Sequence, residues 1–296
     1  MTFELRPGDK VGIIAPSRWL KSPDDLTAGL RYLKERGIQP VIGPHVFDTW
    51  RYMAGTIADR AADIMEFYKN PEIKAIFCVG GGDGSQYLLP HLDYDVIRQN
   101  PKPIFGHSDN NALQLGIISQ TGQTAYSGFV LVYDFRHGGS LEPLTRQSLE
   151  RILEGKKNLA AGGECVISGC ARGRLIGGCL SLFRNLCGTP YFPDLRESIL
   201  LFEDEEEPTY KLDLMLQQIS MQPGFDKVRG IVFGHFENCP VRRPDDGSID
   251  EMIEHFTRGL NIPVIKNFPY GHGIDHHVLP LGAVCKLDAD NRTLEY

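Results

Sequence analysis

Short apolar runs alternate with amphipathic segments through the first half of the chain. Residues 10–16 form an apolar run that predicts a buried strand ending at a proline, and residues 74–79 predict another strand. Between them, apolar positions recur at helical spacing over residues 22–36 and 56–68, with a short strand expected at 40–42. This alternation is typical of a parallel sheet covered by helices.

Two of the predicted strands run directly into glycine turns. The strand at 74–79 continues into Gly80-Gly81-Gly82-Asp83-Gly84-Ser85, and a short apolar helix is expected at 87–89. The strand at 103–105 continues into Gly106-His107-Ser108-Asp109, before an apolar helix. Because open α/β folds place their sites where parallel strands end, both turns are expected on one functional edge of the sheet.

The pattern changes after about residue 156, where helical periodicity fades and glycine becomes frequent. We expect a linker near 155–163, and helices at 209–220 and 249–258. Strands are expected at 165–168, 172–176, 199–202, 230–233 and 263–265. The sequence therefore predicts an α/β domain over residues 1–160 and a β-rich domain over residues 161–296.

Composition narrows the function. The 296 residues carry a formal charge of -7, which argues against nucleic acid as a partner. Neither a secretory signal nor an apolar stretch of membrane-spanning length is evident, so we expect a cytoplasmic protein without a membrane partner. The seven cysteines lack metal-type spacing and fit reduced thiols in the core. Chemistry on a small molecule or peptide is the favoured class.

Ser108 is the candidate nucleophile. A serine at a sharp strand-to-helix turn is exposed above the sheet, and the free amide of the next residue, Asp109, can bind an oxyanion. Gly106 allows the turn, while Asn110 replaces the usual second glycine and tolerates unusual backbone angles. The alternative is that Ser108 or Asp109 only caps the following helix.

The glycine run at 80–84 has three interpretations. Its exposed amides, at Gly81 or Gly82, would complete an oxyanion hole beside Ser108. The same Gly-Gly-Asp-Gly-Ser run after a strand also resembles the phosphate-binding loop of nucleotide-dependent kinases. A tight turn that merely needs glycine is the third interpretation.

Several histidines could act as the base that a serine nucleophile needs. His272 lies between two glycines, in a loop close to an apolar turn expected at 279–282. His276 and His277 are near enough to compete, and His235 also ends a strand. His107 is expected to point away from Ser108, because neighbouring side chains in a strand alternate.

The acid that orients the base is expected at the end of the strand at 199–202. Glu203 is the candidate, because a carboxylate that ends an apolar strand lies at a sheet edge and is partly desolvated. Asp204 stays an alternative, since strand alternation could present either residue. Glu205, Glu206 and Glu207 are expected to form a solvated acidic loop.

Taken together, these segments resemble the S66 peptidase family, which comprises the LD-carboxypeptidases and the microcin C7 self-immunity proteins. The resemblance covers nearly the whole chain. It is carried by residues 5–17, 78–89 and 106–113, by Gly177-Gly178-Cys179-Leu180-Ser181 with Gly188-Thr189, by Glu203-Asp204 with Pro208-Thr209-Tyr210, and by Gly271-His272 with Pro280-Leu281-Gly282.

The resemblance implies a catalytic triad of Ser108, Glu203 and His272. It also implies an oxyanion hole formed by the Asp109 amide and the amide of Gly81 or Gly82. Family members have a flavodoxin-like or amidotransferase-like N-terminal domain and a β-rich C-terminal domain, need no cofactor or metal, and are usually homodimers. The implied reaction is hydrolysis of an amide near the carboxyl end of a small peptide or a peptidyl nucleotide, and a kinase is the alternative.

Three departures from the family pattern concern the residues that would face the substrate. The common Gly-Tyr-Ser-Asp turn has His107 in place of tyrosine, and the glycine loop lacks its frequent arginine. Cys179 replaces the asparagine that usually follows the glycine pair. The loss of the arginine favours the immunity-protein branch over the murein carboxypeptidases, so the sequence leaves the natural substrate open.

Overall fold

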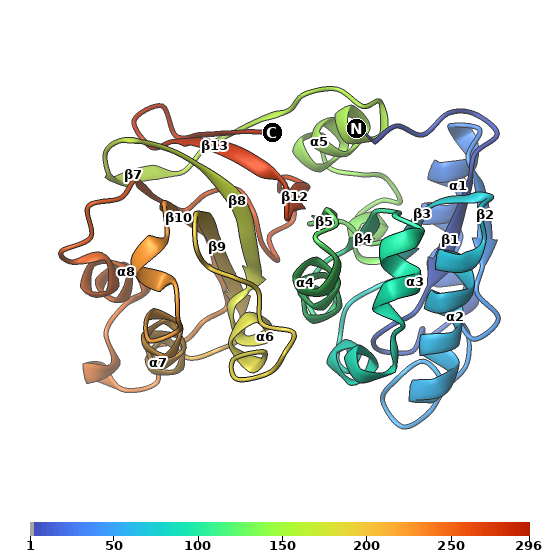
Figure 1. Ribbon diagram of the computed structural model, residues 1–296, viewed down its shortest axis with the longest axis horizontal. Coiled ribbons are helices and arrows are strands. Elements are labelled where there is room, and N and C mark those ends of the chain that lie inside the picture. Colours follow the sequence, from blue (N-terminus) through green and yellow to red (C-terminus); the bar gives the residue numbers. More distant parts are fainter. Residues whose placement is uncertain (1–2) are drawn as a thin grey trace.

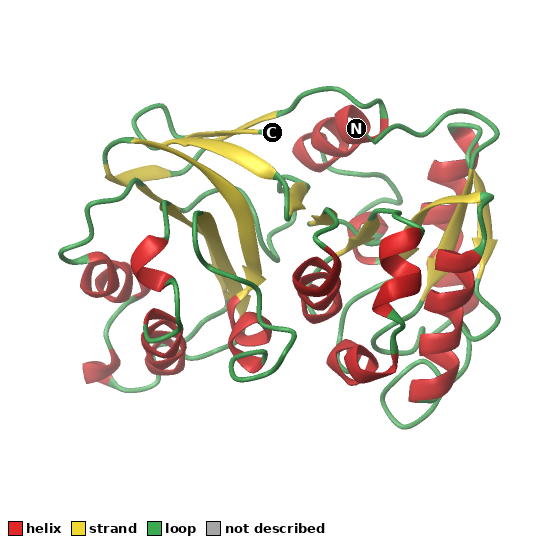
Figure 2. Ribbon diagram, viewed as in Figure 1, coloured by secondary structure: helices red, strands yellow, loops and turns green. Residues whose placement is uncertain are grey.

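Two mixed β-sheets form two lobes that lie side by side (Figure 1), and helices flank both sheets (Figure 2). The computed structural model describes residues 3–296. The α-helices are α1 (Thr27–Glu35), α2 (Ile57–Lys69), α3 (Tyr94–Gln99), α4 (Asn110–Thr121), α5 (Pro143–Leu153), α6 (Leu180–Asn185), α7 (Thr209–Ser220) and α8 (Ile249–Thr257). Short 3-10 helices are η1 (Pro23–Leu26), η2 (Ser85–His91), η3 (Tyr133–Phe135), η4 (Phe225–Lys227) and η5 (Pro244–Asp246). The mixed α/β fold confirms the predicted fold class.

The first sheet has the strand order β12-β5-β4-β3-β1-β2. Its strands are β1 (Lys10–Ile14), β2 (Gln39–Ile42), β3 (Ile73–Cys78), β4 (Ile104–Gly106), β5 (Ala125–Ser127) and β12 (Leu279–Leu281). The five strands from the first half of the chain run parallel, as the alternating pattern predicts. β12 pairs antiparallel with β5. The turn expected at 279–282 is therefore wrong, because those residues close the edge of this sheet.

The second sheet has the order β6-β14-β13-β8-β9-β10-β11-β7. Its strands are β6 (Leu159–Ala161), β7 (Glu164–Ile167), β8 (Cys170–Cys179), β9 (Ser198–Glu205), β10 (Gly230–Glu237), β11 (Val264–Lys266), β13 (Val284–Asp288) and β14 (Thr293–Glu295). β8, β9, β10 and β11 form a parallel centre, and the outer strands pair antiparallel. The linker expected at 155–163 thus contains an edge strand, β6.

Local sequence explains where the helices begin. Thr56 accepts a hydrogen bond from the Asp59 amide, and the Asp59 carboxylate accepts one from the Thr56 amide, which forms a capping box for α2. Ser248 and Glu251 form the same arrangement at α8. The short helix expected at 87–89 is the 3-10 helix η2, which contains Pro90 and so lacks the amide that a continuing α-helix needs.

Helix α4 joins the two lobes into one core. The helix is buried from Asn110 to Ile118, and its Leu113 and Leu115 belong to the same apolar cluster as Phe183 and Phe202 of the second lobe. The lobes therefore share a continuous apolar contact, to which buried hydrogen bonds such as that from the Cys179 amide to Asn111 Oδ1 are added. The domain division at residue 160 stays a prediction. Within residues 3–296, no helix combines the length and apolar character needed to cross a membrane.

Candidate active site

The turn between β4 and α4 holds Ser108 in a strained backbone conformation. Its φ angle is 59°, in the left-handed region that residues other than glycine rarely adopt. Asn110 was expected to take the unusual angle but lies in the first turn of α4 instead. Its side chain fixes the turn, since Nδ2 donates to Ser17 Oγ at 2.8 Å and to the Gly80 carbonyl at 3.2 Å. Strain of this kind is a feature of nucleophile elbows.

The carboxylate of Asp109 connects this turn to the glycine loop. It accepts hydrogen bonds from the Ser85 amide at 2.8 Å, the Gly84 amide at 3.2 Å and Ser17 Oγ at 2.5 Å. It makes no capping bond to α4, so Asp109 is not merely a helix cap. Because the Gly84 and Ser85 amides already bind this carboxylate, they are not free to bind a phosphate, as a kinase would require.

The amides expected to bind an oxyanion lie beside Ser108. A Cβ atom built on Gly81 would be 2.9 Å from Ser108 Cβ, so the glycine loop contacts the serine directly. Gly82 has a φ angle of 117°, which only glycine adopts readily. Within residues 3–296, the amides of Gly81, Gly82 and Asp109 have no hydrogen-bond acceptor. Their role as an oxyanion hole stays a prediction.

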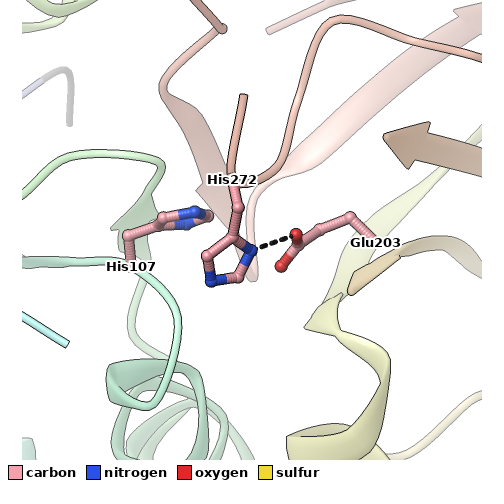
Figure 3. Close-up of side chains that lie close together, drawn as sticks. All are labelled: His107, Glu203 and His272. Atoms are coloured by element: carbon pink, nitrogen blue, oxygen red, sulfur yellow. Dashed lines mark hydrogen bonds and ion pairs between the residues drawn. The ribbon is translucent and has the colours of Figure 1, made fainter. Parts of the chain in front are cut away.

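Ser108, His272 and Glu203 form a continuous chain of hydrogen bonds. Ser108 Oγ lies 2.9 Å from His272 Nε2. His272 Nδ1 lies 2.7 Å from Glu203 Oε2, and Figure 3 shows this second bond. Glu203 is completely buried, and His272 is 9% exposed. An ionised carboxylate only accepts hydrogen bonds, so in the neutral imidazole Nδ1 carries the proton and Nε2 accepts the hydroxyl of Ser108. This is the arrangement in which an imidazole can take a proton from a serine.

Strand alternation separates Glu203 from its alternative, Asp204. Glu203 faces His272, whereas the Asp204 carboxylate accepts hydrogen bonds from the Ser181 amide at 2.7 Å and the Glu205 amide at 2.9 Å. Burial raises the pKa of Asp204 to about 6. Asp204 therefore holds backbone in place, and of these two residues Glu203 is the one that bonds to the imidazole of His272.

The competing histidines are occupied elsewhere. His276 Nδ1 and Nε2 lie 2.7 Å and 2.9 Å from the carbonyl oxygens of Gly273 and Gly128. His277 lies 3.3 Å from the backbone of Ala161. His235 is half-buried beside Glu237, at 3.9 Å. The structure thus brings only His272 to the hydroxyl of Ser108.

Glu205 is a site residue that the sequence analysis missed. Its carboxylate lies 3.8 Å from His272 Nε2, and it is the last residue of β9. The expectation that Glu205 belongs to a solvated loop is wrong, because the strand continues past Phe202 to residue 205. Glu203 and Glu205 then share one face of the strand, two residues apart.

His107 packs against the proposed base, a contact that the sequence did not predict. Its ring centre lies 4.8 Å from that of His272, and the residue is 3% exposed. Burial lowers the pKa of His107 well below its usual range, so the imidazole is neutral. The expectation that His107 points away from Ser108 stays a prediction.

The acidic surroundings of His272 change its basicity. Burial disfavours the charged imidazole, but the negative charges of Glu203, Glu205 and Asp204 outweigh this effect and raise the pKa of His272 to about 9. The imidazole must be neutral to accept a proton from Ser108. Hydrolysis should therefore be slow at neutral pH and increase as the pH rises through about 9.

We predict that Glu205→Gln shifts this pH dependence downwards. Without the Glu205 charge the imidazolium is less stable, so the midpoint of the kcat/KM profile should fall by roughly half a pH unit. The exposed neighbour Glu206 provides a matched control, because Glu206→Gln should leave the midpoint in place. An unchanged midpoint in Glu205→Gln would show that the carboxylate does not act on His272.

Comparisons with known proteins place this geometry in a family. The model of the LD-carboxypeptidase N-terminal domain matches residues 11–128, and that of the C-terminal domain matches residues 172–287. A probable murein peptide carboxypeptidase of Bacillus subtilis is 32% identical over 98% of this chain and 92% of its own. The microcin C7 self-immunity protein MccF of Escherichia coli is 30% identical over 98% of this chain and 93% of its own.

A solved structure agrees with these matches. The structure of MccF in complex with glutamyl sulfamoyl guanosine superposes with a TM-score of 0.87, at 29% identity, and covers 100% of this chain and 97% of that one. The comparisons give the kinase alternative no support. The chain therefore belongs to the S66 peptidases, the family of the LD-carboxypeptidases.

Proposed function

We propose that this carboxypeptidase uses Ser108 as its nucleophile, His272 as the general base and Glu203 to orient that base. The observation that carries the proposal is the continuous chain of hydrogen bonds from Ser108 Oγ through His272 to the buried Glu203. The three side chains come from the two lobes, so the substrate would bind where the lobes meet.

The first half of the reaction forms an acyl-enzyme. His272 Nε2 takes the proton of Ser108 as Oγ bonds to the carbonyl carbon of the substrate, and the electron pair of the carbonyl bond moves onto its oxygen. The amides of Asp109 and of Gly81 or Gly82 would bind this oxyanion. One such donor typically contributes about 3 kcal/mol of transition-state stabilisation.

The second half regenerates the enzyme. As the tetrahedral intermediate collapses, the amide C–N bond breaks and the leaving amine takes the proton from His272 Nε2. A water molecule then attacks the ester carbonyl and gives its proton to Nε2, and the released Ser108 oxygen recovers that proton. Glu203 stays ionised throughout and stabilises the positive imidazole that forms twice in the cycle.

Arg18 is positioned to bind the carboxylate that defines a carboxypeptidase substrate. Its backbone amide lies 3.4 Å from the Gly81 carbonyl, and its exposed guanidinium pairs with Asp83 at 2.8 Å, above the glycine loop. A guanidinium has five donors, so Asp83 leaves several free for a second carboxylate. We propose that Arg18 takes over the role of the arginine that the glycine loop lacks, and that the substrate is a small peptide with a free C-terminus.

A panel of substrates tests the proposed function. In buffer with EDTA, the enzyme should release the terminal residue from a murein tetrapeptide, and the same peptide with an amidated C-terminus should react at least tenfold more slowly because it lacks the charge for Arg18. The third compound in the panel is glutamyl sulfamoyl adenosine, which is related to the ligand bound in the MccF structure. Loss of all hydrolysis in EDTA, with recovery on adding zinc, would contradict a serine mechanism.

A homodimeric state and a cytoplasmic location stay part of the proposal, supported by the family resemblance.

A further inference from the structure

Three side chains with metal-ligating atoms converge behind the nucleophile. One donor atom from each of His107, Glu203 and His272 can be chosen so that all lie within 4.8 Å of one another, and all three residues are buried. Figure 3 shows the ring of His272 between the ring of His107 on one side and the Glu203 carboxylate on the other. His107 comes from the first lobe, and the other two residues come from the second.

Part of this cluster lacks hydrogen-bond partners. Within residues 3–296, both ring nitrogens of His107 and the Oε1 atom of Glu203 are buried and make no hydrogen bond. A buried polar atom without a partner destabilises a folded protein. Such atoms are uncommon in folded proteins, and here they indicate a site that gains partners from a ligand.

We propose that His107, Glu203 and His272 bind a divalent transition-metal ion such as Zn²⁺, and that this ion switches the enzyme off reversibly. Two imidazoles and one carboxylate are ligands that zinc and cobalt accept, with water in the fourth position. The binding part of the proposal stands alone, whereas the inhibition part rests on the proposed function.

The chemistry of binding explains why the ion would inhibit. To coordinate through His272 Nδ1, the metal must replace the proton on that nitrogen and break the 2.7 Å hydrogen bond to Glu203. The protonated imidazole releases its Nδ1 proton to solvent and keeps the proton on Nε2. The base then loses both its orientation and its partner, so the imidazole can no longer accept the proton of Ser108. A metal in this position is a competitor for the catalytic groups and not a catalyst itself.

The geometry also limits the affinity. Ligand atoms around tetrahedral zinc lie roughly 3.3 Å apart, given metal–ligand distances near 2.0–2.1 Å. The present cluster is looser than this, so binding must draw the side chains together and overcome an existing hydrogen bond. We therefore expect weaker binding than at a structural zinc site, and full reversal by EDTA.

His107 is the one proposed ligand outside the proposed catalytic triad. Two variants are useful: His107→Gln keeps the approximate size, and His107→Tyr introduces the residue common in the family. Each should lose metal affinity by more than about tenfold, measured as binding in the Ser108→Ala background so that any effect of His107 on hydrolysis does not enter. His91→Gln, at an exposed histidine, should leave the metal affinity unchanged.

The experiment measures binding and inhibition separately. Binding is followed by calorimetry with Zn²⁺ and by the visible absorption of Co²⁺, in both the wild type and Ser108→Ala, because Ser108 is not a ligand. Inhibition is followed as the loss of wild-type hydrolysis when Zn²⁺ is added. Tight binding in Ser108→Ala that is lost in both His107 variants, with EDTA-reversible inhibition of the wild type, supports the proposal.

Two results would overturn it. Binding that is equally tight in the wild type and in both His107 variants would place the ion elsewhere. Binding without loss of hydrolysis would contradict the proposed inhibition. If the wild type failed to hydrolyse any substrate, the proposed function would fail, yet the binding measured in Ser108→Ala would still decide whether the site exists.

Discussion

Replacing Ser108 by alanine should lower kcat by on the order of 10⁶-fold and leave the fold unchanged. The hydroxyl is the only atom lost, and without it His272 has no proton to accept and no acyl-enzyme can form. The left-handed φ of 59° strains serine and alanine alike, so Tm should change by less than about 2 °C. Hydrolysis of the tetrapeptide and a thermal melt measure the two effects.

A second serine provides the control for this variant. Ser119 lies on α4, partly buried, with its hydroxyl donating to the Gly116 carbonyl at 3.1 Å. Ser119→Ala removes the same atom from the helix that follows the nucleophile and should keep full activity. Mass spectrometry should trap an acyl-enzyme on the wild type and on Ser119→Ala, but not on Ser108→Ala. Retention of more than about 1% of the wild-type kcat in Ser108→Ala would reject Ser108 as the nucleophile.

The second large effect is expected for Glu203→Gln. The amide has the shape of the carboxylate but no charge, so it cannot stabilise the positive imidazole that forms in each step. It can also donate a hydrogen bond to Nδ1 and so favour the wrong tautomer of His272. A loss of kcat of about 10⁴-fold is expected, as for an asparagine in the corresponding position of a serine protease triad.

Glu205→Gln separates this effect from a general loss of negative charge. Both variants remove one carboxylate from the same face of β9, but only Glu203 bonds to Nδ1. Assayed well above the midpoint of the pH profile, Glu205→Gln should therefore lose less than about tenfold in kcat. Equal losses in the two variants would mean that charge alone, and not the orientation of His272, explains the role of Glu203.

Sequence periodicity was sufficient for much of the fold. α7 begins and ends at Thr209 and Ser220, as its pattern predicts, and β1, β2, β3 and β4 follow their apolar runs, whereas β5 was not predicted. β12 could not be predicted in this way, because three residues around Pro280 carry no periodicity. They form a strand only because β5, more than 150 residues earlier in the chain, offers a free edge.

The candidate site shows the same division between local and long-range information. A few adjacent residues are sufficient to predict the bend at Ser108. Glu203 and His272, in contrast, were selected from several candidates by the family resemblance. Glu205 was not predicted as a site residue, because a run of five acidic residues is typical of a solvent-exposed loop. In the structure, β9 extends through the first three of these residues. The contact between His107 and His272 could not be predicted from local sequence, because the two residues lie far apart in the chain and meet only in the folded protein.

The path of the chain around His272 has a consequence for recombining this enzyme with its relatives. The loop that carries His272 leaves the second sheet after β11 and ends in β12, which belongs to the first sheet. Tyr133 of the first lobe also donates a hydrogen bond to the carbonyl of His272, at 2.9 Å. A hybrid joined near residue 160 would therefore mix parents within a single sheet. A functional chimera should take residues 279–281 from the same parent as β5. β12, at the end of the His272 loop, then pairs with a strand from its own parent.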